Sequence, residues 1–260
     1  MQRRFARRLL NAPKNAANET ILLDLGINSI KTEIALKLLK FREKLISEND
    51  SFIGQLFKLN SSLKLNWEKR YQEFMLYYQI DETNLTQNHL ENTLKIKNKE
   101  IQRQFDRLAN ITTTTTTLYR YLRGSNKGQS IYTELNPRRK LETGLIFQFR
   151  AGLNISNYSK YVRHLTDIPY CPFCNLVENE SHIIEECPEY MKERETFIKK
   201  ISELKQNIPQ NTKLTEVVLY SYHFEEKIQN LDNKTKEKID SLIKDYIYRI
   251  YIRRSKTNAA

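Results

Sequence analysis

The stretch CPFCNLVENESHIIEEC, residues 171–187, decides how the carboxyl-terminal half of this chain folds. It holds all three cysteines of the chain and one of its four histidines, in the spacing C-x2-C-x7-H-x4-C. In structural sites Zn²⁺ is bound tetrahedrally by four thiolate or imidazole ligands, and three cysteines with one histidine are a common set. We therefore predict a structural zinc site formed by Cys171, Cys174, His182 and Cys187.

Three other interpretations of the cysteines are open. A disulfide is disfavoured because three cysteines leave one thiol unpaired and the sequence begins without the apolar segment of a secretory signal. A redox C-x-x-C pair normally opens a helix in a βαβ unit, which the flanking sequence does not suggest. The third alternative is chance clustering with a surface histidine. Paired cysteine spacing with a histidine favours the metal, and four protein ligands indicate a structural rather than a catalytic ion.

A module of this size buries little apolar area, so a bound metal would supply much of its folding energy. We expect Phe173, Ile183 and Ile184 to form its small core. Phe173 has an alternative use, because an aromatic side chain in such a module can stack on a nucleic-acid base.

Composition favours helices over a sandwich or barrel. The 260 residues are 39% apolar, and the helix breakers glycine and proline number only six each. The formal net charge of +12 predicts attraction to a polyanion, of which RNA and DNA are the commonest. A solvated lysine-rich surface is the simpler explanation of the lysine content. No apolar run is long enough for a membrane span.

Hydrophobic periodicity predicts a mostly α fold, with a helical N-terminal segment, a small zinc-stapled helical module and a C-terminal amphipathic helix. The expected helices cover residues 1–11, 19–25, 27–49, 51–65, 67–80, 86–109, 137–150, 158–165, 188–205 and 234–254. In the helix 86–109 we expect one narrow apolar stripe formed by Leu90, Leu94, Ile101, Phe105 and Leu108.

Six consecutive threonines, Thr112–Thr117, suggest a domain boundary. Low complexity usually marks a linker, and β-branched runs disfavour helix. We therefore predict a helical region over residues 1–110, a threonine-rich linker over 111–135 and a zinc-binding helical region over 136–260.

Basic residues gather near both ends of the chain and around the cysteine cluster, where phosphates could be neutralised. The candidate nucleic-acid contacts are Arg3, Arg4, Arg7, Arg8, Arg138, Arg139, Lys140, Arg150, Lys160, Arg163, Arg249 and Arg253. Some of the N-terminal arginines could instead pair with Glu19 or Asp24. Tyr158, Tyr161 and Tyr170 interleave with the central cations, which suits base stacking, but half-buried packing is their alternative use.

Two segments resemble non-LTR (LINE-type) retrotransposon reverse transcriptases. FRAGLNISNYSKYVRHLTDIPYCPFCNLVENESHIIEECPEY, residues 149–190, is similar to the region near the C-terminus of that family, where an Arg-x-Gly segment, here Arg150 and Gly152, precedes a cysteine–histidine zinc motif. RRFARRLLNAPKNAANETILLDLGINSIKTEIALKLLKFREKL, residues 3–45, more loosely resembles the thumb and post-thumb stretch.

The departure from the family is large, because the sequence contains no Asp-Asp pair to hold the two metal ions of polymerase chemistry. Together with this missing pair, the resemblance implies a non-catalytic fragment or remnant of such an enzyme. We expect it to bind RNA or DNA with little sequence preference. The alternative is a domesticated structural subunit of a ribonucleoprotein or other complex. A true enzyme, such as a nuclease, ranks last.

The expected location is intracellular and nuclear. Mitochondrial import is the alternative, because Arg3, Arg4, Arg7, Arg8 and Lys14 precede the first acid of the chain.

Overall fold

The computed structural model describes residues 2–48, 50–63, 65–81, 85, 88–111, 139–204, 213–219 and 232–257. Within these ranges every regular element is a helix, and the β pairing is a single isolated bridge between Tyr170 and Val177. The predicted mostly α fold is confirmed. None of the described helices is long and apolar enough to cross a membrane.

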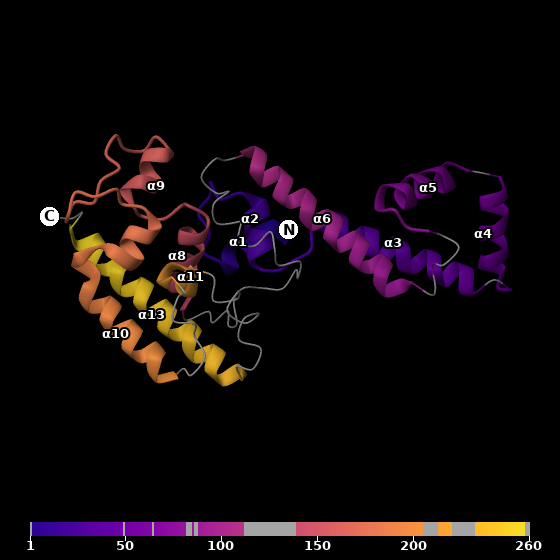
Figure 1. The fold of residues 1–260 in the computed structure, drawn as a ribbon. Helices are drawn as coiled ribbons and strands as arrows, with labels where there is room; N and C mark the ends of the chain where they lie inside the picture. Colours follow the sequence, from indigo (N-terminus) through magenta and orange to yellow (C-terminus); the bar gives the residue numbers. More distant parts are fainter. Residues whose placement is uncertain are drawn as a thin grey trace. The chain divides into compact units, whose positions relative to one another are not determined.

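The helices follow the predicted order closely (Figure 1). Their bounds are α1 Gln2–Leu9, α2 Asn18–Asp24, α3 Ile30–Ser47, α4 Phe52–Ser62, α5 Asn66–Tyr78, α6 His89–Ile111, α8 Lys140–Arg150, α9 Asn157–Val162, η3 His182–Glu186, η4 Pro188–Tyr190, α10 Met191–Leu204, α11 Leu214–Leu219 and α13 Asn233–Thr257. The short helix α11 was not predicted, because six residues are too few to show a helical period.

The chain divides into two compact units. Unit 1 comprises residues 1–27 and 107–260, and unit 2 comprises residues 28–106. The N-terminal helices α1 and α2 therefore group with the cysteine-containing region rather than with α3–α5. The predicted linker lies almost wholly outside the described residues, so the domain boundaries remain a prediction.

Unit 2 has a core formed by α3, α5 and α6, which buries Leu39, Tyr71, Met75 and Ile96. Ser29 starts α3, because its hydroxyl accepts a hydrogen bond from the backbone N–H of Thr32.

The predicted stripe on α6 is partly wrong, because Phe105 and Leu108 are buried as expected but the N-terminal half of the stripe is not. Leu90 and Leu94 are 78% and 56% exposed, whereas the buried line on the helix runs through Asn92, Ile96 and Glu100. The stripe was drawn from hydrophobicity alone, but the hydroxyl of Tyr78 donates a hydrogen bond of 2.8 Å to Glu100, which allows this carboxylate to be buried.

A buried ion pair joins α3 to α5 in unit 2. The guanidinium of Arg42 donates to both carboxylate oxygens of Glu68, at 3.0 and 3.2 Å. The same guanidinium lies 4.0 Å from the ring centroid of Phe57 and 4.3 Å from that of Tyr71. Aromatic faces attract a cation and shield it from water, so this pair fixes how α3 and α5 pack.

Low pH should destabilise unit 2, because it protonates the carboxylate of Glu68. Burial by itself would raise the pKa of this carboxyl, but hydrogen bonds from Gln72, Arg42 and Ser61 outweigh burial and hold the pKa below the ordinary value of 4.5. The ionised group therefore stabilises the fold above that value, and this stabilisation is lost as pH falls through the lowered pKa. The only tryptophan of the chain, Trp67, lies in unit 2 and reports on it by fluorescence.

We expect Glu68→Gln to lower the denaturant midpoint of the Trp67 signal at neutral pH and to flatten its decline toward acid. An unchanged pH dependence would show that Glu68 does not contribute.

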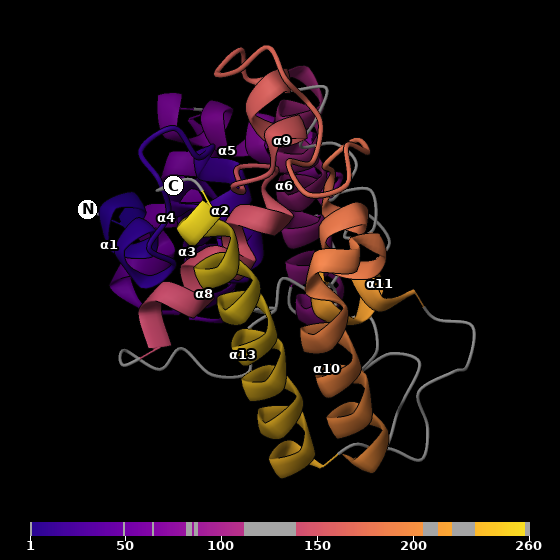
Figure 2. The same ribbon diagram turned by 90° about the vertical axis from the view of Figure 1, so that its left-hand side faces the viewer.

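In unit 1, α13 packs on α10 and α8, and α11 packs on α8 and η3. Figures 1 and 2 both show α10 and α13 side by side. The core contains Phe147 and Phe149 of α8, Phe197 of α10 and Tyr246 of α13. The rings of Phe197 and Tyr246 stack with centroids 4.8 Å apart.

A close backbone approach joins the N-terminal helices to α8. A Cβ atom added to Gly144 would lie 2.8 Å from the Cβ of Asn11, a distance that carbon atoms do not tolerate without displacement. Glycine at this position therefore lets α8 pack against the residues that follow α1.

Candidate metal centre

Cys171, Cys174, His182 and Cys187 come together, with their ligand atoms all within 4.8 Å of one another. The Sγ atoms of Cys171 and Cys187 are 3.8 Å apart, and Cys174 Sγ lies 3.2 Å from His182 Nε2. Two thiolates each 2.3 Å from one tetrahedral ion would be about 3.8 Å apart, and a thiolate and an imidazole about 3.5 Å apart. These side chains are therefore arranged as a Cys3His cluster that could hold one metal ion.

The first two ligands lie on a tight turn closed by a two-stranded backbone pairing. Cys171 N donates to Leu176 O at 2.7 Å, and Glu178 N donates to Pro169 O at 2.9 Å. Asn175 follows the second cysteine with a φ of 59°, a left-handed conformation that asparagine adopts more easily than most residues. This turn carries Cys171 and Cys174 to the same side of the chain.

The other two ligands lie on a π-helical turn. Cys187 N donates to His182 O at 2.7 Å, an i to i−5 bond that defines this helix type. In an α-helix, residues five apart would point about 140° away from each other. The wider π turn reduces this angle, which brings Cys187 round to the side of His182. Asn179 starts the turn, because its Oδ1 accepts a 2.7 Å bond from His182 N.

Burial shapes the acid–base properties of the thiols. It raises the pKa of Cys171, and it raises the pKa of Cys187 to about 12, with a further contribution from the negative charge of a neighbouring Cys171 thiolate. A cation in the cluster would offset this penalty, because metal ions bind the thiolate and displace its proton.

A carboxylate lies near the second ring nitrogen of His182. His182 Nδ1 lies 3.6 Å from Glu186 Oε2, on the side of the ring opposite the cluster. A carboxylate at the second nitrogen of a ligating histidine favours the tautomer whose Nε2 is free to bind a metal. At 3.6 Å the two groups are outside hydrogen-bond range, so Glu186 acts on His182 as a nearby charge and not as a hydrogen-bond partner.

Helices α10 and α13 fix the π turn from outside. Arg194 of α10 donates to Ile184 O at 3.1 Å and to Cys187 O at 2.6 Å. The hydroxyl of Tyr246 on α13 donates to Ile184 O at 2.7 Å. These bonds reach carbonyls at the end of the turn from two other helices, so they tie the cluster to the core of unit 1.

A buried ion pair connects the first half of the cluster to the last helix. Arg254 Nε of α13 lies 3.0 Å from Glu178 Oε1, and its Nη2 lies 3.1 Å from Glu178 Oε2. Both side chains are almost fully buried. Asn157 at the start of α9 joins them, since its backbone N–H donates to Glu178 and its Oδ1 accepts from Arg254.

The predicted small core of the module is observed. Ile183 and Ile184 are fully buried, and the ring of Phe173 packs edge-to-face on Tyr190 with centroids 5.9 Å apart. Phe173 itself is only partly buried. Its packing on Tyr190 supports the core interpretation.

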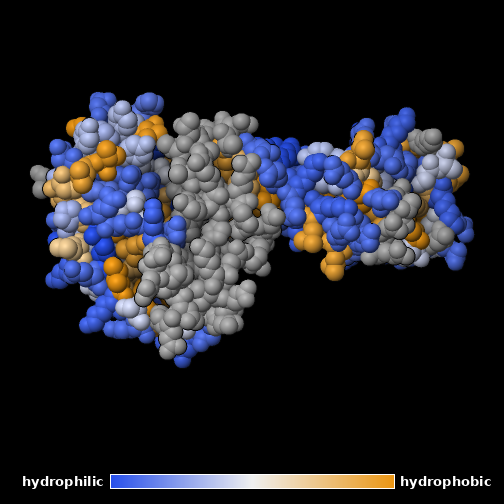
Figure 3. Space-filling view, viewed as in Figure 1, coloured by the Kyte–Doolittle hydropathy of each residue, from blue (hydrophilic) through white to orange (hydrophobic). Residues whose placement is uncertain are grey.

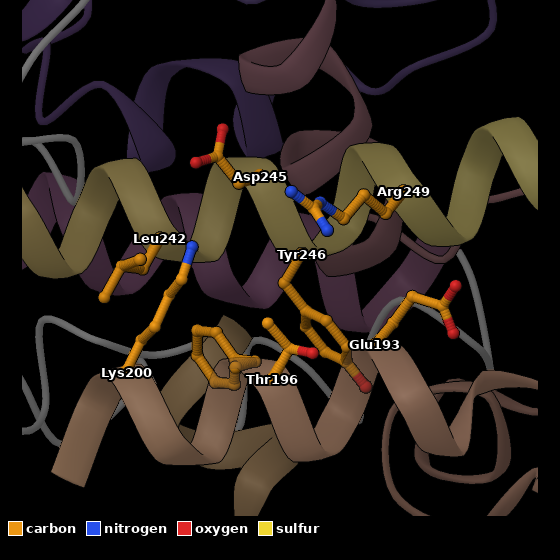
Figure 4. A pocket seen from close by; sticks show the side chains of 8 residues that line it. Glu193, Thr196, Lys200, Leu242, Asp245, Tyr246 and Arg249 are labelled. Atoms are coloured by element: carbon orange, nitrogen blue, oxygen red, sulfur yellow. The ribbon is translucent and has the colours of Figure 1, made fainter.

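Four of the candidate nucleic-acid contacts are exposed: Arg4, Arg8, Lys140 and Arg249. Arg249 of α13 and Lys200 of α10 both line a hollow between these two helices (Figure 4). The hollow also contains Asp245 and Glu193, but Asp245 pairs with Arg139 and Glu193 pairs with Arg253.

Four other candidates hold the fold together. Arg7 donates to the carbonyls of Pro13, Lys14 and Ala16. Arg139 bonds Ser241 and Asp245 of α13, Arg163 bonds the carbonyls of Asn154 and Ser159, and Arg253 pairs with Glu189 and Glu193. Of the two acids considered as partners of the N-terminal arginines, Glu19 lies 3.6 Å from Arg107 and Asp24 is fully buried.

The structure corrects the prediction that Arg150 contacts nucleic acid. It is 3% exposed, and its Nε donates to the carbonyl of Leu219 on α11. A guanidinium enclosed in this way cannot reach a phosphate, so Arg150 is a packing residue that holds α11 against α8. Lys160 is partly buried, and the side chains of Arg3 and Arg138 lie outside the described residues.

Sequence reasoning missed Asn179, Glu178 and Arg194. Asn179 had a signal, because an asparagine three residues before the buried His182 is a helix-start pattern. The partners of Glu178 and Arg194 are distant in sequence or are backbone atoms, so spacing alone gives no sign of them.

Comparison of the chain with protein-family models, with curated proteins and with solved structures gave no match. No family is thereby identified. The chain is a mostly helical protein with a buried Cys3His cluster.

Proposed function

We propose that this chain is a non-catalytic nucleic-acid-binding protein, derived from the C-terminal region of a non-LTR reverse transcriptase, in which a zinc ion at the Cys3His cluster holds unit 1 together. The observation that carries the zinc proposal is the set of four protein ligand atoms that all lie within 4.8 Å of one another. Four protein ligands leave no position for substrate or water, which is the arrangement of a structural site.

The proposed contacts to nucleic acid lie on the exposed cations of unit 1. Arg4 and Arg8 lie one helical turn apart on α1, with no acid in that helix. In the hollow between α10 and α13, both acids already have arginine partners, which leaves the positive charges of Lys200 and Arg249 available to phosphates. Contacts of this kind neutralise phosphates and carry no base preference.

Salt titration tests this proposal. Fluorescein-labelled single-stranded RNA and duplex DNA should bind the purified chain more weakly as KCl rises. Arg4→Ala with Arg8→Ala should weaken binding and reduce the slope of log affinity against log salt by about 1.4 for single strands.

The matched control removes the same charge from unit 2, by Lys69→Ala with Arg70→Ala, two exposed residues of α5. Affinity that does not respond to salt, or equal losses in the two double variants, would contradict the proposed contacts.

A second candidate, a structural subunit of a ribonucleoprotein, is favoured by the ion pairs of Arg139 and Arg253, because these cations are already engaged with acids of the same chain. The absence of measurable RNA and DNA binding at low salt would favour this candidate.

A further inference from the structure

The zinc module is acidic although the chain is basic. Residues 164–191 contain six acids and neither lysine nor arginine, whereas the whole chain carries a net charge of +12. The six acids are Asp167, Glu178, Glu180, Glu185, Glu186 and Glu189. Three thiolates around one divalent ion would add a further negative charge. Glu178 and Glu189 pair with Arg254 and Arg253 of α13, so the excess negative charge rests on Asp167, Glu180, Glu185 and Glu186. This charge disfavours a polyanion at this part of the surface.

The same module exposes a row of apolar side chains, here called the knuckle rim: Ile168, Tyr170, Leu176 and Val177. Their exposed fractions are 60%, 47%, 57% and 43%. Tyr170 and Val177 face each other across the isolated β-bridge, and Ile168 lies two residues before Tyr170, so these three share one face. In Figure 3, hydrophobic surface is visible at the end of unit 1 that carries α9 and this module.

The rim is held rigidly in place. Asn157 of α9 donates a hydrogen bond of 2.6 Å to the carbonyl of Tyr170, and Cys171 and Cys174 of the cluster lie on the turn between Tyr170 and Val177. A preformed apolar surface binds a partner without the cost of ordering its own side chains.

The charges next to the rim are mainly negative. Asp167 is exposed beside Ile168. Glu180, three residues after Val177, is partly exposed, and its Oε1 accepts a hydrogen bond of 2.7 Å from the side-chain amide of Asn154. The nearest cations along the chain are on α9, where Arg163 is engaged with two backbone carbonyls and Lys160 is partly buried. Burial and the nearby charge of Arg254 lower the pKa of Lys160, which agrees with its limited contact with water.

We propose that the knuckle rim is a docking surface for a partner protein, and that it takes a basic segment whose lysines or arginines alternate with apolar residues. Charge complementarity favours this partner, because its cations would meet Asp167 and Glu180 while its apolar residues cover Ile168 and Val177. Exposed apolar patches of this kind, rimmed by polar residues, commonly mark protein interaction sites. The inference goes beyond the proposed function, since it assigns the rim to protein rather than to nucleic acid.

Fluorescence anisotropy with the full chain and a labelled amphipathic peptide of lysine and leucine tests the proposal. Ile168→Ser with Val177→Ser should weaken peptide binding by at least about tenfold, the loss typical of central interface residues. Asp167→Lys should also weaken it. Ile198→Ser removes a similarly exposed apolar residue from α10 and should have no effect. A peptide in which glutamate replaces lysine should not bind.

Three results would overturn the proposal. One is equal peptide binding by the rim variant and the Ile198→Ser control. Another is loss of labelled RNA binding in the rim variant, which would make the rim a nucleic-acid contact. The last is a protein that sediments as a dimer and becomes monomeric on Ile168→Ser with Val177→Ser, which would make a second copy the occupant. Failure of RNA binding alone would count only against the proposed function, since the peptide test does not depend on it.

Discussion

Replacing Cys187 with serine is expected to abolish metal binding and to unfold the carboxyl-terminal part of unit 1. The thiol is fully buried, and its backbone is bonded to His182 and Arg194. A missing ligand should weaken zinc binding by more than about a hundredfold, because even loss of a residue that only supports a ligand costs about 10–100-fold. Metal binding to such a module is coupled to its folding, so helicity and melting temperature should both fall.

Two histidine variants provide a matched comparison for this cluster. His182→Asn removes a ligand and should behave like Cys187→Ser. His164→Asn changes an exposed histidine with a φ of 55°, a conformation that asparagine also tolerates, and should keep full zinc content. Circular dichroism and elemental analysis of the three proteins separate the outcomes. Equal zinc content in His182→Asn and His164→Asn would contradict the assigned ligand set.

The second large effect is expected at Arg254. Its replacement by methionine leaves Glu178 as a charge buried without its partner, and breaking a buried pair in this way typically costs about 3–5 kcal/mol. Because the pair joins the zinc turn to α13, the loss should appear both as a lower free energy of unfolding and as faster release of the metal to a chelator.

The double variant Glu178→Gln with Arg254→Met tests whether the charge itself causes the loss. Removing both charges should be less damaging than Arg254→Met alone, since no uncompensated charge remains. Urea unfolding followed by circular dichroism measures the free energies. A change of less than about 1 kcal/mol in Arg254→Met would mean that this contact does not hold α13 to the module.

The sequence was sufficient to predict the helices and the residues of the Cys3His cluster because both are local signals. The period of apolar residues in α13 and the spacing of Cys171 and Cys174 can be read within one turn of chain. Local spacing could not predict which arginines are exposed and which are bound within the fold. Arg7 and Arg150 carry the same charge as Arg4, but the backbone carbonyls that bind them are brought near only by the fold.

The buried face of α6 shows the same limit. Hydrophobicity pointed to Leu90 and Leu94, whereas the fold buries Glu100 because the hydroxyl of Tyr78 on α5 reaches it. A polar residue can occupy a core position when a partner from another element satisfies it, and sequence periodicity does not reveal such a partner.

The most direct test of the central claim is X-ray absorption spectroscopy of the purified chain at the zinc edge, combined with elemental analysis. We predict one zinc ion per chain, bound by three sulfur atoms at about 2.3 Å and one nitrogen atom at about 2.0 Å. A chain that contains no zinc, or a zinc ion surrounded by oxygen ligands, would contradict the account.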